Sequence, residues 1–261
     1  HYSYSIGPDG GTIEVNILFD EPKTIPLVID GERYELIVVE GCGFYGRYGD
    51  PLVPEYGLIV ALPTKSDVPE VDVSGYMVKY FGRHNIVPRQ KPVPIGGHTE
   101  HLEFIKNVKT YRMKDIYPRQ IMGRYTVGYM RGIPLVRIPL YPIRVIPSSG
   151  KTYFYYFLQV TIRFSIPENY RPGTYDKKSL NFVSELLGDN IVGIREAISY
   201  SEDIFGQRKT LRGSYDYVIV TADTFYDIAR RYAELKSHKN IDVFIANISW
   251  IKSNYGGVDV P

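Results

Sequence analysis

Hydrophobic and polar side chains alternate along much of the first two-thirds of the chain, a pattern typical of β-strands that are buried on one face. In the segment TIEVNILF, the apolar side chains of Ile13, Val15, Ile17 and Phe19 fall on the same face. A second alternating segment contains Gly75, which we interpret as a β-bulge. The strands predicted in this region are residues 12–19, 33–39, 57–62 and 71–80.

The clearest strand pair is a predicted hairpin in which residues 135–145 and 152–164 flank a turn at 147–150. Its second strand alternates strictly and has a polar outer face. Pro139 and Pro142 lie inside the first strand, and because proline has no N–H to donate, we expect this strand to be at an edge or bulged. Many short strands separated by Gly and Pro turns predict an antiparallel β-sandwich or barrel of roughly 165 residues.

The pattern changes near residue 215 to that of a strand, a helix and a strand. Residues 215–221 form a short apolar run, residues 224–237 have helical spacing, and residues 241–245 are apolar again. This order predicts the opening of a parallel α/β sheet. Thr224 and Asp227 have the spacing of a capping box at the helix start. The side chains predicted to face the sheet are Phe225, Ile228, Ala229, Tyr232 and Leu235.

The α/β segment is expected to be incomplete by itself, because a parallel sheet needs helices on both faces and several more strands. The last residues read as a turn at Gly256 and Gly257 followed by a helix start at Asp259 and Pro261. We therefore expect the sequence to stop within a fold, either because it is a fragment or because a longer precursor was cut here.

Three regions follow from these patterns: a β module over residues 1–170, a helix and linker over 171–214, and the start of an α/β domain over 215–261. A linker rich in Pro and Gly is predicted at 166–175 and a short amphipathic helix at 180–187. Residues 200–214 are polar and separate the β module from the α/β segment.

The composition excludes several classes of function. Lys and Arg number 31 against 29 Asp and Glu, so the net charge of +2 does not favour nucleic acid as a partner. The single cysteine rules out a disulfide within the chain and a cysteine-based zinc site. No apolar run approaches the roughly 20 residues of a membrane span. Twenty-four tyrosines and 18 prolines fit a stable, extracytoplasmic protein rich in β-structure.

Few residues carry a recognisable chemical motif, and we expect no required cofactor. Cys42 lies in a Gly-rich turn and is interpreted as a buried or half-buried thiol, not a nucleophile. His98 and His101 could approach a metal, but no third ligand has convincing spacing, and exposed loop histidines are the alternative. Structural calcium is possible, with oxygen ligands drawn from Asp50, Asp67, Asp72 and Asp223.

Three stretches of the chain carry a resemblance to a known family. The first is YGDPLVPEYGLIVALP at 48–63, the second is the Arg-Gly strand, turn and alternating strand at 130–164, and the third is the strand, helix and strand at 215–261. Together they resemble the gingipain-type cysteine peptidases, a family of secreted enzymes made as zymogens, and the third is similar to the first βαβ unit of that family's caspase-like catalytic domain. The ordered set spans nearly the whole chain.

The resemblance implies a β-sandwich prodomain, acting as folding aid and inhibitor, followed by the start of a cysteine endopeptidase domain. It places the catalytic His and Cys beyond residue 261, so this chain would contain no catalytic residue of that kind. The implied partners are the remainder of the same precursor, which would complete the sheet, and a protein or peptide substrate. The implied location is secreted, extracellular or at the cell surface.

The resemblance also implies a maturation cut between the prodomain and the catalytic domain, after a basic residue. The polar segment QRKTLRG at 207–213 lies at this junction. Arg212 is the predicted processing site, with Arg208 and Lys209 as alternatives. An ordinary solvated linker is the competing interpretation of this basic run.

A prodomain can block its enzyme by laying a loop through the substrate cleft. Residues 89–124 have weak strand signals and are the least regular part of the β module. If the family preference for Arg or Lys at the cleaved bond holds, one basic residue here would mimic substrate. The alternative is that these residues form an ordinary surface loop. The candidates are Lys106, Lys109, Arg112, Lys114, Arg119 and Arg124.

Two hypotheses of different classes remain. In the first, the chain is the N-terminal part of a cysteine endopeptidase zymogen. In the second, it is a non-catalytic secreted or cell-surface module whose β-sandwich binds a partner or has a structural role, since fold does not fix function. A His followed by a Cys, each at a strand end in later sequence, would favour the first.

Overall fold

A computed structural model describes residues 1–7, 9–64, 66–67, 69–92, 103–130, 132–167, 191–205 and 215–255 of the chain. The chain forms two compact units, residues 1–206 and residues 207–261, and each is treated by itself below. The predicted helix at 180–187 and the predicted turn and helix start after residue 255 lie outside the described residues. No helix in the described part of the chain is long and apolar enough to cross a membrane.

Unit 1 (residues 1–206) consists mostly of β-strands, and every strand pair in its sheets is antiparallel, as predicted. Its strands are β1 Tyr2–Gly7, β2 Gly10–Leu18, β3 Lys23–Ile29, β4 Glu32–Val38, β5 Gly43–Tyr45, β6 Val53–Ala61, β7 Glu70–Arg83, β8 Thr126–Met130, β9 Ile133–Leu140, β10 Ile143–Ile146 and β11 Lys151–Ser165. Its helices are α1 Val108–Tyr111 and α3 Ile194–Phe205.

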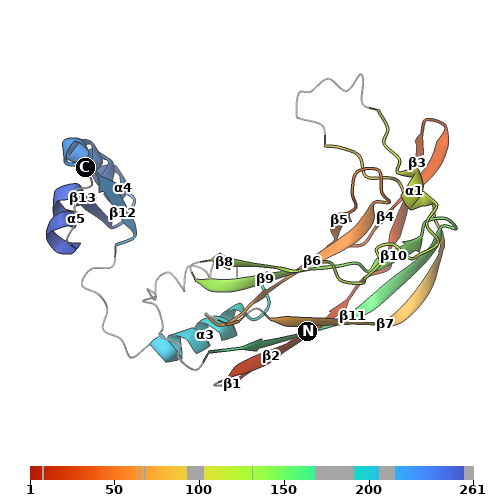
Figure 1. The fold of residues 1–261 in the computed structure, drawn as a ribbon, viewed down its shortest axis with the longest axis horizontal. Helices are drawn as coiled ribbons and strands as arrows, with labels where there is room; N and C mark the ends of the chain where they lie inside the picture. The colour runs from red at the N-terminus through yellow and green to blue at the C-terminus, as the bar shows by residue number, and fades with distance from the viewer. Residues whose placement is uncertain are drawn as a thin grey trace. The chain divides into compact units, whose positions relative to one another are not determined.

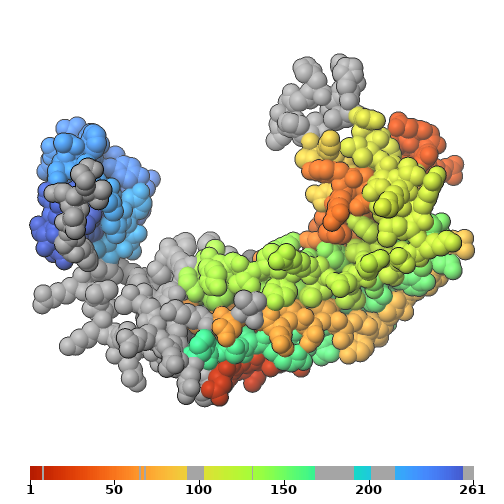
Figure 2. Space-filling view, viewed as in Figure 1, coloured from red at the N-terminus to blue at the C-terminus, as the bar shows by residue number. Residues whose placement is uncertain are grey.

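The long strand β11 organises a five-stranded sheet in the order β1-β2-β11-β10, with β7 also paired to β11. Strands β10 and β2 follow one another along one edge of β11, whereas β7 runs along the opposite edge. In Figure 2 the red N-terminal strands and the orange β7 accordingly lie beside the green β11. A separate hairpin is formed by β3 and β4.

The second sheet has the order β5-β6-β9-β8 and shares one hydrophobic core with the first. The two sheets lie one above the other in Figure 1. The buried side chains alternate along the strands, as expected, and include Ile13, Val15, Leu158, Val160 and Ile162 from the first sheet and Leu58, Val60, Val136, Ile138 and Leu140 from the second. Each of these ten side chains is at most 5% exposed, so both inner faces are fully desolvated.

The predicted strand 135–145 is wrong in one respect, because it is two strands in different sheets. Strand β9 belongs to the second sheet and β10 to the first, and the chain crosses between them at Tyr141 and Pro142. Strand β9 is not at an edge, since it lies between β6 and β8. Pro139 is tolerated there because the pairing of β8 ends at Arg137, so no strand needs an N–H at residue 139.

Gly75 does not form the bulge that the sequence suggests. The irregularity in the β7–β11 pairing falls near Gly82, between Thr152 and Tyr153 of β11. Gly75 is required for space instead, because a Cβ atom there would lie 2.6 Å from Ile121 Cδ1 and 2.7 Å from a ring carbon of Tyr155. A glycine is therefore needed at position 75 because the side chains around it pack closely, not because the strand bulges there.

Unit 2 (residues 207–261) contains β12 Tyr217–Thr221, the 3₁₀ turn η1 Asp223–Phe225, α4 Tyr226–Ser237, β13 Val243–Asn247 and α5 Ile248–Tyr255. Strands β12 and β13 are parallel neighbours, with Tyr217 opposite Val243 and Thr221 opposite Asn247. The predicted parallel pairing is therefore confirmed. Strand β13 begins two residues later than expected, and α5 was not predicted.

The start of α4 differs from the predicted capping box. Thr224 lies within η1, so Phe225 becomes the N-cap and no side chain caps the helix. Asp223 instead accepts hydrogen bonds from the backbone N–H and the hydroxyl of Ser249 in α5, at 3.3 and 2.8 Å. Of the five side chains predicted to face the sheet, only Ala229 is buried.

We predict that Gly75→Ala will lower the free energy of unfolding by about 1–3 kcal/mol, because the added methyl group overpacks against Ile121 and Tyr155. Urea denaturation measures this. Gly128→Ala in β8 is the matched control, since a Cβ atom there meets nothing within 4 Å and stability should stay within about 0.5 kcal/mol. Equal effects at the two positions would contradict the packing role of Gly75.

Candidate functional site

Residues 103–125, called the basic segment below, contain all six candidate inhibitory residues. The short helix α1 is its only regular element, as the weak strand signals suggested. The segment is nevertheless attached to the two sheets at several points by specific hydrogen bonds. These attachments decide which of the six basic side chains a partner could reach.

The first attachment is centred on the buried carboxylate of Asp50, which is 6% exposed. Its Oδ1 accepts hydrogen bonds from the Thr110 hydroxyl at 2.6 Å and from the Asn107 side chain at 2.8 Å. Asn107 also caps α1. Just before it, the side-chain amide of Gln90 bonds both the N–H and the C=O of Ile105, each at 2.9 Å. Buried polar groups with these partners fix the backbone here.

The second attachment lies along β10. Tyr117 and Val145 exchange two backbone hydrogen bonds, at 2.6 and 2.7 Å. The guanidinium of Arg144 donates to the carbonyl oxygens of Pro118 and Arg119. Charge-assisted bonds of this kind are stronger than neutral ones, so the chain is held firmly on both sides of Pro118.

Lys106 is occupied by contacts within unit 1. Its ammonium lies 2.7 Å from the Glu32 carboxylate and above the rings of Tyr34 and Tyr111, at 4.9 and 5.2 Å from their centroids. Burial alone would lower the pKa of Lys106, but the interactions with Glu32 and Tyr34 outweigh it and raise that pKa. Lys106 therefore joins the basic segment to the β3–β4 hairpin and is poorly placed to enter a partner's pocket.

The other five basic side chains are exposed. Lys109 lies in α1 and Arg112 is its C-cap, so both have helical backbone. Arg119 forms a loose ion pair with Asp115 at 3.5 Å, and its carbonyl is held by Arg144. Since proteases bind extended peptide, these three positions are unfavourable for substrate mimicry.

Arg124 lies in irregular backbone and, with Arg119, lines a pocket of about 530 Å³. The same pocket is lined by Glu55, Tyr45 and Tyr141. Glu55 forms an ion pair with Arg137 on β9 and is largely buried, with 16% of its side chain exposed. Arg124 thus belongs to a concave part of the surface, which is less suited to insertion into an enzyme cleft.

Lys114 has the geometry that substrate mimicry requires. It is exposed and lies in irregular backbone between two attachments. Before it, the carbonyl of Met113 accepts the N–H of Ser148 at 3.0 Å, and after it Tyr117 pairs with Val145. A side chain presented between fixed points loses little conformational freedom on binding.

The remaining candidate groups are not brought together. The described residues contain no group of three or more His, Cys, Asp or Glu side chains that could hold a metal ion. The four aspartates considered for calcium have separate partners: Asp50 bonds Thr110 and Asn107, Asp67 accepts from Ser165, Asp72 pairs with Arg163, and Asp223 bonds Ser249. His98, His101, Arg208, Lys209 and Arg212 lie outside the described residues.

Cys42 packs against the hydrophobic core and is half-buried, as predicted. Burial raises the pKa of its thiol to about 12, with a further contribution from the negative charge of Glu55. The reactive thiolate is therefore almost absent at neutral pH. Within the described part of the chain, no feature would make Cys42 a nucleophile.

Sequence reasoning missed the partners that organise the site. Glu32 and Lys106 are 74 residues apart, and Asp50 and Thr110 are 60 apart. No local signal connects such pairs, because they meet only when the sheets have formed. The role of Gln90 could not be predicted either, because a single amide side chain in a loop belongs to no recognisable pattern.

Comparisons with known proteins identify one family and two structures of similar fold. Residues 9–195 match a family model described as Propeptide_C25. A search of curated proteins finds no match. Two solved structures from Porphyromonas gingivalis are similar in fold. One, on the zymogenic latency of gingipain K, has a TM-score of 0.55 at 16% identity and covers 64% of this chain and 93% of its own. The other, a complex of RgpB pro- and mature domains, has a TM-score of 0.57 at 10% identity and covers 74% and 97%.

We predict that Cys42 will react slowly with iodoacetamide at pH 8, where a thiol of pKa about 12 is only about one part in ten thousand ionised. Because a raised pKa delays ionisation, the rate should keep rising about tenfold per pH unit through pH 10. Mass spectrometry follows the adduct, and the urea-unfolded chain serves as control. A plateau near pH 9 in the folded chain would contradict the raised pKa.

Proposed function

This chain belongs to the family of C25 peptidase propeptides, and on that basis we propose that unit 1 is a β-sandwich prodomain that inhibits a gingipain-type cysteine peptidase and assists its folding. The observation that carries the proposal is the match over residues 9–195, which covers nearly all of unit 1. A secreted or cell-surface location is part of the same proposal.

Unit 2 is proposed to be the start of the peptidase domain of the same precursor, with a caspase-like sheet. Its parallel β12–β13 pair with an intervening helix supports this, since such units rarely occur outside larger α/β sheets. Its exposed apolar surface also supports it. Val218 and Val220 of β12 are 54% and 68% exposed, and Phe225, Ile228 and Leu235 are 59%, 66% and 65% exposed.

The remainder of the precursor is the proposed cover for this surface. Val218 and Val220 lie two residues apart on one face of the strand, so a single further element could cover both. Apolar groups of this size are rarely left in water on an isolated unit. RgpB is a comparable case, because its pro- and mature domains form a complex.

Inhibition is proposed to act through the basic segment, with Lys114 as the side chain that enters the specificity pocket. The supporting observations are its exposure and its position between the backbone attachments at Met113 and Tyr117. An acidic group in the enzyme's pocket would be its partner, and such a charge-assisted contact contributes about 1.5–3 kcal/mol. Lys106, held by Glu32, would act only by shaping the segment.

The test is to add the full 261-residue chain to the mature peptidase of its own precursor and to follow hydrolysis of a peptide with Lys or Arg at the cleaved bond. Lys114→Ala should weaken inhibition by about 10- to 150-fold, the equivalent of the lost contact. Lys114→Arg should retain most of it. The matched control is Lys109→Ala, which removes another exposed lysine, from α1, and should leave inhibition unchanged.

Two results would count against this proposal. Absence of inhibition by the wild-type chain at micromolar concentration would remove the inhibitory function. Inhibition that is unaltered by Lys114→Ala, but lost in Arg124→Ala, would move the specificity contact to the pocket lined by Glu55.

We also predict that the rest of the precursor will protect unit 2 from hydrogen exchange. In the 261-residue chain, the amides of β12 and α4 should exchange faster than those of β11, because their apolar faces are uncovered and their local stability is low. In the full precursor the same amides should become slow. Equal protection of β12 and β11 in the 261-residue chain would contradict an incomplete unit 2.

A further inference from the structure

The pocket of about 530 Å³ beside the basic segment carries an excess of positive charge. Arg119 and Arg124 line it, and the only acidic residue among its described lining residues is Glu55. Glu55 forms an ion pair with Arg137 at 2.5 Å, so its charge is already neutralised. The two arginines of the basic segment are therefore the charges that a ligand in this pocket would meet.

Both arginines can turn toward a ligand. Arg119 pairs with Asp115 at 3.5 Å, but the two side chains are 80% and 70% exposed, and such surface pairs contribute little. Arg124 is exposed and forms no ion pair within the part of the chain that the structure describes. Arg144 adds a further positive charge at the wall, because its guanidinium donates to the carbonyls of Pro118 and Arg119, which both line the pocket.

The backbone before Arg124 is fixed by pairing with the end of β9. The N–H of Tyr141 donates to the carbonyl of Ile121 at 2.8 Å. The N–H of Gly123 donates to the carbonyl of Pro139, also at 2.8 Å. A Cβ atom on Gly123 would lie 2.4 Å from the hydroxyl oxygen of Tyr141, so glycine permits this close approach. A site that is formed in advance loses little conformational freedom when a ligand binds.

Two tyrosine rings form an apolar wall of the same pocket. The rings of Tyr45 and Tyr141 have centroids 4.6 Å apart, and both residues line the pocket. Tyr45 also stacks on Tyr117, whose backbone pairs with Val145 of β10, so the wall is anchored to the first sheet. Burial raises the pKa of Tyr141, so its hydroxyl stays neutral. Such a wall suits the methylene groups of a side chain, and the arginines suit a carboxylate at its end.

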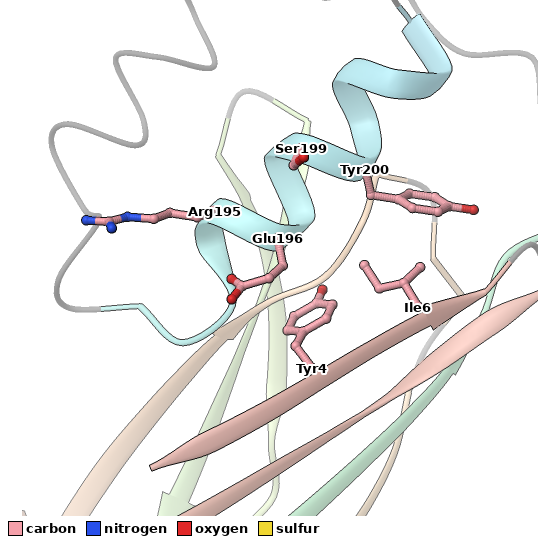
Figure 3. Close-up of a pocket in the computed structure, with 6 residues that line it drawn as sticks. All are labelled: Tyr4, Ile6, Arg195, Glu196, Ser199 and Tyr200. Atoms are coloured by element: carbon pink, nitrogen blue, oxygen red, sulfur yellow. The ribbon is translucent and has the colours of Figure 1, made fainter.

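A second pocket of unit 1, of about 470 Å³, lies between β1 and α3 and has no such excess of charge (Figure 3). It is lined by one arginine and one glutamate, Arg195 and Glu196, whose charges balance. Glu196 accepts a hydrogen bond from the Tyr2 hydroxyl at 3.1 Å. The Tyr200 hydroxyl donates to the carbonyl of Gly7 at 3.3 Å. These contacts join α3 to the first sheet.

Tyr4 has a structural role in this second pocket. Its hydroxyl donates to the carbonyl of Ala61 at 3.1 Å. Its ring lies directly against Gly193, where a Cβ atom would be 2.2 and 2.5 Å from two ring carbons. Gly193 also has a φ of +73°, a conformation that favours glycine. The groups of this pocket hold α3 in place, so the pocket beside the basic segment is the better candidate for a ligand.

We propose that the pocket lined by Arg119 and Arg124 binds the carboxylate of an Asp or Glu side chain that projects from the peptidase inhibited by unit 1. The proposal rests on the inhibitory function proposed above and adds a second contact to it. The exposed Lys114 enters the enzyme, whereas the pocket, reached five residues later at Arg119, receives a group from the enzyme. Two contacts of opposite direction fix how the segment lies on its partner, because complementary charges select one orientation.

The test is inhibition of the mature peptidase of the same precursor by the full 261-residue chain, with the inhibition constant measured from progress curves of peptide hydrolysis. Arg124→Ala should raise this constant about tenfold. Arg124→Glu, which places a like charge against the carboxylate, should raise it at least about 100-fold. Arg112→Ala and Arg112→Glu are the matched controls, since Arg112 is an exposed arginine of the same segment that does not line the pocket. They should change the constant by less than about threefold.

Two further measurements separate a ligand contact from a structural role. The difference between wild type and Arg124→Ala should shrink at about 0.5 M salt, where charges are screened. The Tm of Arg124→Ala should equal that of wild type, because the side chain is exposed and has no ion pair among the described residues.

The enzyme side of the contact is identified by replacing the exposed Asp and Glu residues of the peptidase, one at a time, with Asn and Gln. One of these changes should weaken inhibition by the wild-type chain and be non-additive with Arg124→Ala, which is the signature of direct contact. The effects of Lys114→Ala and Arg124→Ala should add, because the two side chains contact different groups.

The outcomes separate this pocket from the inhibition itself. Absence of inhibition by the wild-type chain would remove the proposed function and the role of the pocket with it. Inhibition by the wild-type chain, with equal constants for Arg124→Glu and Arg112→Glu, would overturn the pocket contact and leave the inhibitory function in place. The same conclusion would follow if no replacement in the peptidase were non-additive with Arg124→Ala.

Discussion

The pairing of β11 with three other strands is the constraint on which the rest of unit 1 depends. Because β11 is 15 residues long, it can hold β10 and β2 in succession along one edge and β7 along the other. The same pairing directs Leu158, Val160 and Ile162 toward the second sheet, and all three are fully buried. A shift of one residue would turn these side chains to solvent, so the core and the register stabilise each other.

Polar contacts fix the structure at the two margins of this core. At one, the buried Asp50 and the guanidinium of Arg144 fix a segment that has almost no regular structure of its own. At the other, tyrosines of β1 hold α3 above the shared core. Buried polar groups are costly unless they are paired, so these contacts specify one conformation where apolar packing alone would allow several. One oxygen of Glu196 has no hydrogen-bond partner among the described residues, so this requirement is only partly met beside α3.

Unit 2 illustrates the difference between forming secondary structure and forming a stable core. Its strands pair in parallel and its helix lies along them, yet Val220 and Ile228 remain about two-thirds exposed. A βαβ unit can satisfy its own backbone hydrogen bonds, but it has too few layers to bury both faces of its sheet. The stability of unit 2 is therefore tied to whatever covers it, which is the physical basis for the proposal that it belongs to a larger domain.

The sequence by itself determined the antiparallel β-structure of unit 1, the inward face of residues 13–19 and the parallel order of β12 and β13. These follow from short-range periodicity, which burial on one face imposes directly. Only the tertiary structure decided that residues 133–146 divide between two sheets, that Gly75 makes room for Ile121, and that Lys106 is held by Glu32. It also decided that Lys114 is presented between attachments and that Tyr4 packs on Gly193. These contacts join residues up to 189 positions apart, and nothing local in the chain encodes which strands will bring such residues together.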